Sequence, residues 1–196
     1  MMIATLALLL QLAVPKQEAR KIATCEIRDT SHTYVVIHYD SAAETNTTFR
    51  WLRRKGLSYN YFIKRDGTVV KWLDPKCKAN HAGLSYYDGH FRMNNVSVGV
   101  ALQNIPPAAY TERQYQSLAW LVTNLENRWP DLKGHPPVGH SDVAIPRGRK
   151  RDPGPLFRWA YLDTLLARCR NTCQTDTLGI TKAHTEKSHV RQRIHG

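Results

Sequence analysis

Short β-branched runs alternate with helical segments along the middle of this chain, and this alternation constrains the fold more than any other feature. Tyr34–His38 and Val96–Leu102 predict buried strands, and Tyr59–Trp72 predicts a hairpin that turns at Asp66-Gly67. Strands that alternate with helices favour a sheet with helices on its faces. We therefore expect a single α/β domain built around a central β-sheet.

Three segments are expected to be helices. Thr111–Trp129 repeats apolar residues at helical spacing and opens with a Thr-x-x-Gln capping box. Ala43–Lys55 is followed by a glycine, which is typical of a helix end, and a last helix is expected to start near Pro155 and to run to about residue 168. Pro137–His140 is expected to be a short strand.

The N-terminal end has the pattern of an export signal. Ile3–Val14 is apolar apart from two residues, which suits the core of a signal peptide and is short of the roughly 20 residues that a spanning helix needs. Ala13 and Ala19 are candidate cleavage positions. The alternative is a buried N-terminal helix. We expect residues 1–19 to be a signal peptide, the product to be exported (periplasmic or secreted), and no transmembrane anchor.

Four cysteines support the same expectation. Cys25, Cys77, Cys169 and Cys173 form an even set, which in an exported chain indicates two disulfides in one of three connectivities. Reduced thiols are the alternative. Residues 171–196 show little apolar periodicity, and we expect a basic, disordered tail there.

The charge balance indicates an anionic partner. Lys and Arg number 28 against 16 Asp and Glu, a net charge of +12. Nucleic acid, anionic lipid and an anionic cell wall all attract such a protein. The basic residues form no recognised nucleic-acid module, so we expect no nucleic-acid partner.

Two histidines and an aspartate are candidates for a metal site. His38 ends the first predicted strand, His140 ends another, and Asp152 follows twelve residues later in a loop. Because strand ends meet at one rim of a sheet, these side chains can converge. Two imidazoles and one carboxylate, with a fourth position open, are typical of catalytic zinc. On spacing alone, a histidine at a strand end is more often just a polar residue at a sheet edge.

The local sequence around these residues resembles a known family. Val138–Pro155 (VGHSDVAIPRGRKRDPGP) is similar to the zinc-dependent N-acetylmuramoyl-L-alanine amidases, a family that includes phage amidases and is related to peptidoglycan recognition proteins. Four further segments match in the same order: Val35–Ala42, Ser58–Val69, Asn80–Ser85 and Asn94–Leu102. The resemblance covers roughly residues 31–168 and implies a mixed β-sheet flanked by helices.

The resemblance also implies the chemistry of the site. It implies that Zn²⁺ is bound by His38, His140 and Asp152, and that Lys150 and Tyr59 are catalytic. Lys150 matches the family's catalytic lysine, which stabilises the oxyanion. Tyr59 matches a tyrosine of the phage and recognition-protein branches.

Three further positions match the substrate groove of the family: His81, Gly83 and Asn95. One position departs from it, because Ala101 stands where the bacterial anhydro-muropeptide amidases have a catalytic glutamate, and Gln103 does not replace that residue. The phage branch lacks this glutamate too.

The resemblance therefore predicts a zinc-dependent hydrolase of the amide between N-acetylmuramic acid and L-alanine. The alternative is a peptidoglycan-binding module that does not cut. We expect an N-terminal segment at 20–30, a zinc amidase domain at 31–170 and the tail at 171–196. The expected partners are peptidoglycan or muropeptide and anionic cell-wall polymers, and the protein is expected to be a monomer.

Overall fold

A computed structural model describes residues 13–20, 25–27, 33–41 and 44–171 of the chain. The strands are β1 (Gln17–Ala19), β2 (Tyr34–Tyr39), β3 (Tyr61–Ile63), β4 (Val69–Lys71), β5 (Tyr86–Tyr87), β6 (His90–Phe91), β7 (Ser97–Leu102) and β8 (Val138–Gly139). The helices are α1 (Thr45–Arg54), the 3-10 helix η1 (Met93–Asn95), α2 (Glu112–Arg128), the 3-10 helix η2 (Pro130–Leu132), α3 (His140–Val143) and a helix over residues 159–171.

Six strands form one mixed sheet in the order β1-β4-β3-β7-β2-β8. β3 and β4 are antiparallel, and every other neighbouring pair is parallel. β7 lies between β3 and β2, and its register with β2 puts Ala101 beside His38. β5 and β6 form a separate hairpin. The predicted α/β domain with a mixed central sheet is confirmed.

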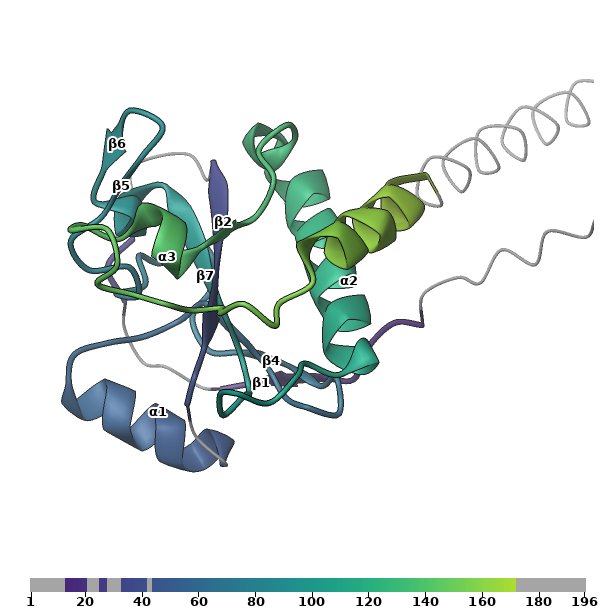
Figure 1. The fold of residues 1–196 in the computed structure, drawn as a ribbon, viewed down its shortest axis with the longest axis horizontal. Helices are drawn as coiled ribbons and strands as arrows, with labels where there is room; N and C mark the ends of the chain where they lie inside the picture. The colour runs from purple at the N-terminus through teal and green to yellow at the C-terminus, as the bar shows by residue number, and fades with distance from the viewer. Residues whose placement is uncertain (1–12, 21–24, 28–32, 42–43, 172–196) are drawn as a thin grey trace, which may run out of the picture.

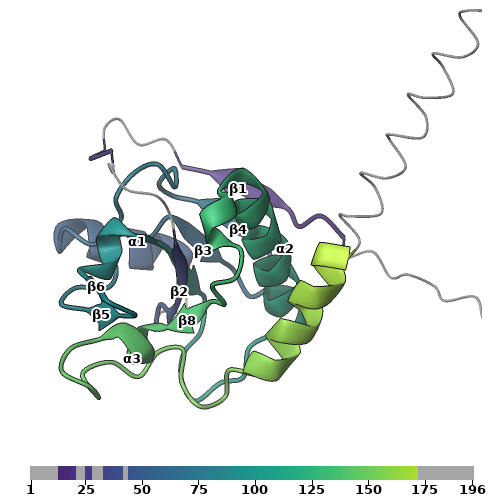
Figure 2. The same ribbon diagram turned by 90° about the horizontal axis from the view of Figure 1, so that it is seen from above.

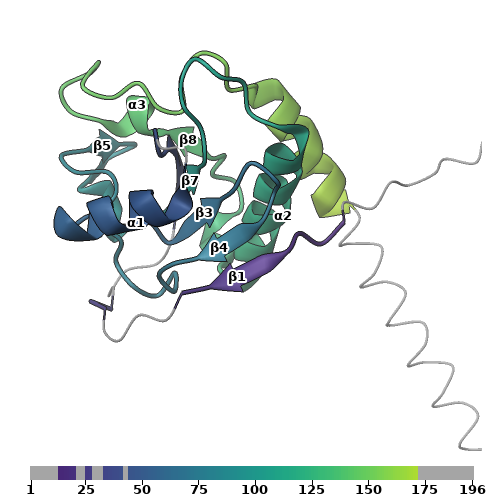
Figure 3. The same ribbon diagram turned by 90° about the horizontal axis from the view of Figure 1, so that it is seen from below.

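Helices cover both faces of the sheet (Figure 1, Figure 2 and Figure 3). α2 and helix 159–171 lie on one face, and α1 lies on the other. Because successive strand residues point to opposite faces, Val35 and Ile37 of β2 enter the core beneath α2, whereas Val36 packs in a separate cluster. His38 is on the same face as Val36, and this alternation directs its side chain away from the α2 core.

Most of the predicted elements are present at the expected places. The capping box at the start of α2 is formed, with the Thr111 hydroxyl accepting from the Gln114 backbone and the Gln114 side chain accepting from Thr111. The hairpin turns at Gly67, which has φ +87°. α1 ends before Gly56, whose φ of +66° suits a glycine after a helix. Residue 43, where this helix was expected to begin, lies outside the described residues.

Two element boundaries differ from the prediction. The strand predicted at Pro137–His140 is shorter, since His140 begins α3. The prediction of a helix starting near Pro155 is wrong, because the helix begins at residue 159. Gly154 has φ +84°, and the chain keeps turning there so that Phe157 can enter the core against Tyr115 of α2.

The N-terminal region is tied to the sheet at two points. β1 pairs with β4, and Cys25 forms a disulfide with Cys77, with 5.7 Å between the Cα atoms. This confirms one predicted disulfide; the second involves Cys173, which lies outside the described residues. Residues 1–12 and 172–196 also lie outside them, so the predicted signal core and tail stay predictions. Among the described residues, no helix is both long and apolar enough to cross a bilayer.

Candidate metal centre

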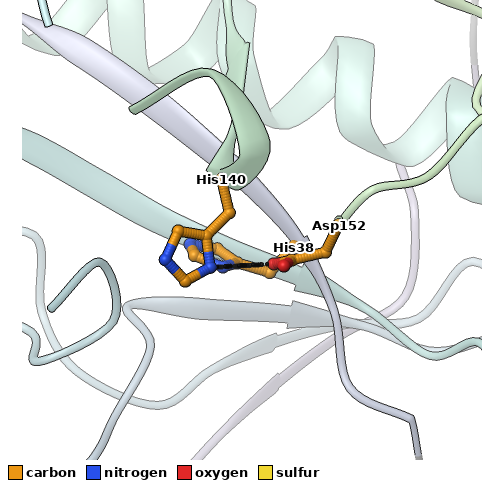
Figure 4. A group of neighbouring side chains, drawn as sticks. All are labelled: His38, His140 and Asp152. Carbon is orange, nitrogen blue, oxygen red and sulfur yellow. Dashed lines mark hydrogen bonds and ion pairs between the residues drawn. The ribbon is translucent and has the colours of Figure 1, made fainter. Parts of the chain in front are cut away.

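Three predicted ligands from distant parts of the chain meet at one point (Figure 4). His38 comes from β2, His140 from the first turn of α3 and Asp152 from the following loop. The Nδ1 atoms of the two histidines are 3.0 Å apart, and Asp152 Oδ2 lies 2.9 Å from Nδ1 of His38 and 3.0 Å from Nδ1 of His140. All three residues are buried. The geometry agrees with a three-ligand metal site.

The contact that His140 makes through Nε2 determines whether its Nδ1 carries a hydrogen or a lone pair. His140 Nε2 lies 3.0 Å from the backbone oxygen of Ala82, which can only accept a hydrogen bond. In a neutral ring the hydrogen is therefore on Nε2, and Nδ1 directs a lone pair at Asp152. A carbonyl that orients a histidine in this way is typical of metal-ligating imidazoles.

Acceptor atoms that face one another are stabilised by a proton or a metal cation between them. Two ligands about 2.05 Å from a tetrahedral zinc ion lie about 3.3 Å apart, close to the 2.9–3.0 Å separations seen here. Two nitrogens and one carboxylate oxygen also suit zinc chemically. The residues present therefore fit a zinc ion.

The protonation states also suit a metal. Burial lowers the pKa of His38 to about 4, with the charges of His140 and Lys150 acting in the same direction and Asp152 opposing them. Burial alone would raise the pKa of Asp152, but the adjacent imidazoles of His140 and His38 outweigh it and hold the pKa of this carboxyl below its usual range. At neutral pH, His38 is neutral and Asp152 is ionised, as metal ligands must be.

Both predicted catalytic residues lie beside the three ligands. The ring of Tyr59 is 4.9 Å from that of His38, measured between centroids. Burial, and then the charges of Asp152 and Asp40, raise the pKa of Tyr59, so its hydroxyl stays protonated and can donate a hydrogen bond. Lys150 is exposed and lines the same cleft.

Two of the predicted ligands, His140 and Asp152, line a cleft of about 670 Å³, and His38 is buried behind them. Trp51 and Leu57, from α1 and the turn after it, form one wall, and the loop containing Lys150 contributes to the lining. His81 also lines the cleft, but its buried ring packs edge-on against His38, with centroids 5.1 Å apart. The other two predicted substrate residues, Gly83 and Asn95, are outside the set that lines it.

Ala101 occupies the position where the resemblance to the bacterial branch implies a glutamate. It lies beside His38 in the sheet, is fully buried, and packs with Phe49 and Phe62 in an apolar cluster that Tyr59 also contacts. A carboxylate at this position would lie next to the ligands. In this chain the same space is apolar.

Several supporting residues were not anticipated from the sequence. Asn94 Oδ1 accepts hydrogen bonds from the backbone N–H groups of His81 and Ala82, which fixes the loop beneath the ligands. Arg149 donates to the carbonyls of Ala82 and Leu84, so it clamps this loop to the one that carries the aspartate. The pair Asn94-Asn95 in the matching segment was the available signal; the sequence predicted a role for Asn95, whereas Asn94 makes these contacts.

Comparison with known proteins agrees with this description. A family model described as N-acetylmuramoyl-L-alanine amidase matches residues 28–155. The 1,6-anhydro-N-acetylmuramyl-L-alanine amidase AmpD of Escherichia coli (strain K12) is 38% identical over 112 residues, which cover 57% of this chain and 60% of that protein. The matched part thus spans less than two thirds of this relative.

Solved structures show the same fold. The crystal structure of a selenomethionine derivative of AmpD has a TM-score of 0.66 at 27% identity and covers 79% of this chain and 97% of that one. The amidase AmiD from E. coli, solved with anhydro-N-acetylmuramic acid-L-Ala-D-gamma-Glu-L-Lys, has a TM-score of 0.62 at 26% identity and covers 74% of this chain and 60% of that one. Because the family match covers well over half of the 196 residues, this chain belongs to the N-acetylmuramoyl-L-alanine amidase family.

Proposed function

We propose that this protein hydrolyses the amide bond between N-acetylmuramic acid and L-alanine, with Zn²⁺ held by His38, His140 and Asp152. The observation that carries this proposal is the convergence of three acceptor atoms within about 3 Å of one another, beside a cleft that His140 and Asp152 line. Family membership and the names of the relatives support the choice of reaction.

The proposed chemistry divides between the metal and two side chains. When bound, zinc would polarise the scissile carbonyl and lower the pKa of a water molecule. Lys150 would stabilise the negative charge that develops on the carbonyl oxygen. Tyr59, kept protonated by its burial, would donate a hydrogen bond to that oxygen or to the attacking water. Since Ala101 supplies no carboxylate, the proposed reaction proceeds without a base from β7.

The walls of the cleft suit a peptide that carries carboxylates. Trp51 and Leu57 offer apolar surface, and Lys150 and Arg151 offer positive charge. The ligand in the AmiD structure is a muramyl peptide, which has this combination of apolar and acidic groups. We propose a muropeptide as the substrate, either within the cell wall or as a soluble anhydro-fragment.

A second candidate function is recognition of muropeptide without cleavage. Ala101, which pairs with His38, favours it, because the resemblance to the bacterial branch implies a catalytic glutamate at this position. The three converging ligands favour hydrolysis, because binding alone does not need an open metal site.

One experiment separates these candidates. The protein is incubated with intact peptidoglycan and with anhydro-muropeptide, and the products are analysed by mass spectrometry. Release of stem peptides with a new L-alanine amine, lost on chelation and restored by Zn²⁺, would support the amidase. Unchanged substrate together with measurable binding would overturn it in favour of recognition. Comparing the products from intact peptidoglycan and from anhydro-muropeptide shows which of the two the protein cleaves.

Export is proposed on separate grounds. The Cys25–Cys77 disulfide indicates an oxidising compartment, and a net charge of +12 would hold the protein near anionic wall polymers. β1 is part of the sheet, so cleavage after Ala13 would keep it whereas cleavage after Ala19 would remove it. N-terminal sequencing of secreted material tests this, and an intact Met1 would contradict export. We also propose that the zinc amidase domain spans residues 31–170 and that the protein is a monomer.

A further inference from the structure

A chain of buried hydrogen bonds runs from His38 away from the proposed metal position. His38 Nε2 lies 3.0 Å from Nδ1 of His81, and His81 Nε2 lies 3.3 Å from the hydroxyl of Ser97. That hydroxyl donates to the backbone oxygen of Met93 at 2.5 Å. All four residues are buried. The chain therefore connects a proposed ligand to a fixed carbonyl in η1.

The backbone carbonyl of Met93 determines the direction of every hydrogen bond in this series. A carbonyl only accepts, so the single hydroxyl hydrogen of Ser97 points to Met93 and its oxygen accepts from His81 Nε2. A neutral His81 then has its lone pair on Nδ1. That nitrogen accepts from His38 Nε2, so His38 Nδ1 is left with the lone pair that faces Asp152.

The surroundings of His81 hold its ring in this position. A Cβ atom on Gly99 would lie 2.5 Å from Cγ of the ring and 2.6 Å from Cδ2, so only glycine leaves room for the ring there. Ser97, Gly99 and Ala101 are alternate residues of β7 and share one face, which gives a floor of small side chains. The backbone of His81 is held by Asn94 Oδ1.

We infer that His81, through Ser97, is a positioning residue that fixes the tautomer and orientation of His38 for metal binding. This assigns His81 a role behind the ligand in place of the substrate-groove role implied by the resemblance. The inference rests on the proposed metal site. It differs from a packing role, because packing requires only the shape of the ring whereas positioning requires the acceptor at Nδ1.

Three variants distinguish the two roles. His81→Phe keeps the ring volume and removes the acceptor, His81→Asn returns an acceptor close to the Nδ1 position, and Ser97→Ala removes the group that sets the His81 tautomer. His90→Phe, at an exposed position in β6, is the matched control. Zinc affinity is measured by competition with a chromogenic chelator, and the tautomer of His38 is read from imidazole nitrogen chemical shifts in the metal-free protein.

We expect His81→Phe to weaken zinc binding about 10- to 100-fold, which is the usual effect of losing a partner behind a metal ligand. His81→Asn should recover most of that loss, Ser97→Ala should give a smaller loss, and the control should bind as the wild type does. The His38 hydrogen should be on Nε2 in the wild type. A His81→Phe variant with unchanged zinc affinity, or a wild type with the hydrogen on Nδ1, would overturn the inference.

These readouts do not depend on substrate. If the protein binds zinc but does not cut muropeptide, the proposed activity fails while the positioning role is still measured. If the wild type binds no zinc, the metal site fails, and the His38 tautomer in the metal-free protein still decides whether the hydrogen-bond chain has the stated direction. If His81→Phe does not fold, the Ser97→Ala variant and the wild-type spectrum decide.

Discussion

Replacing Asp152 with asparagine should separate the metal affinity of this protein from the stability of its metal-free form. Asp152 Oδ2 lies within 3.0 Å of Nδ1 on both His38 and His140. When both rings are neutral and hydrogenated at Nε2, these nitrogens carry lone pairs directed at an anion. An asparagine has almost the same shape, and its amide hydrogens can point at either nitrogen.

We expect a large loss of zinc affinity but little change in the stability of the metal-free protein. Structural zinc sites with four ligands bind with about 10–16 kcal/mol, or roughly 2.5–4 kcal/mol per ligand. Weakening one of three ligands should therefore reduce zinc affinity about 100- to 1,000-fold. In the metal-free protein the new amide gains a hydrogen bond with a net value of about 1 kcal/mol. The free energy of unfolding without metal should thus be unchanged or slightly higher.

Two measurements check this prediction. Zinc affinity is obtained by chelator competition, and the free energy of unfolding is obtained from urea titrations in the presence of a chelator at neutral pH. Asp163→Asn, at an exposed position on helix 159–171, removes the same charge far from the ligands and is the control. Wild-type zinc affinity in Asp152→Asn would show that Asp152 is not a ligand. A metal-free variant destabilised by more than about 2 kcal/mol would refute the description of the site as facing acceptors.

Four further results are expected. Tyr59→Phe should lower kcat on muropeptide about 100-fold with zinc content unchanged, because one hydrogen-bond donor is lost; loss of zinc would contradict this. Lys150→Gln should lower kcat by a similar factor at constant zinc content, and full activity would show that this lysine is one more surface charge. Metal-free protein should lose stability on the order of 3 kcal/mol as the pH falls from about 6.5 to 4. In this range His38 is protonated in the unfolded chain but stays neutral in the folded protein, where its pKa is about 4. Urea titrations across this range should show the loss in the wild type and no such slope in His38→Gln. Replacing Cys25 and Cys77 together with serine should lower the free energy of unfolding by about 4 kcal/mol, because the bond closes a loop with a sequence separation of 52, and thermal melts that coincide with the wild type would refute this.

Sequence patterns predicted the elements whose signals are local. The α2 helix carries its own capping box and apolar repeat, and the β3–β4 hairpin carries its own Asp66-Gly67 turn. β1 lacks such a signal, because Gln17–Ala19 has no apolar alternation and is held at the sheet edge by β4. Helix 159–171 begins late because Phe157 packs against α2, which is a long-range contact that Pro155 does not reveal.

The residues of the site also differ in how far the sequence predicted them. His38, His140 and Asp152 are recognisable because their surrounding motifs are distinctive, and the structure brings them together. His81 comes forty-three positions after His38. Its place beside His38 was not predictable, because it depends on how its loop packs onto small residues of β7. A family motif predicted a functional role for this histidine, but only the packing shows that its ring faces His38.

The wide spacing of the three predicted ligands would couple metal binding to folding. His38 and Asp152 are separated by 114 positions, and His38 and His140 by 102, so the site exists only after β2, β8 and the loop that follows have assembled. An ion that binds only the assembled state stabilises it by mass action, by about 4 kcal/mol when its concentration is 1,000 times the dissociation constant. The zinc supply of the surrounding compartment would then set how long this protein survives proteolysis, as well as how fast it works.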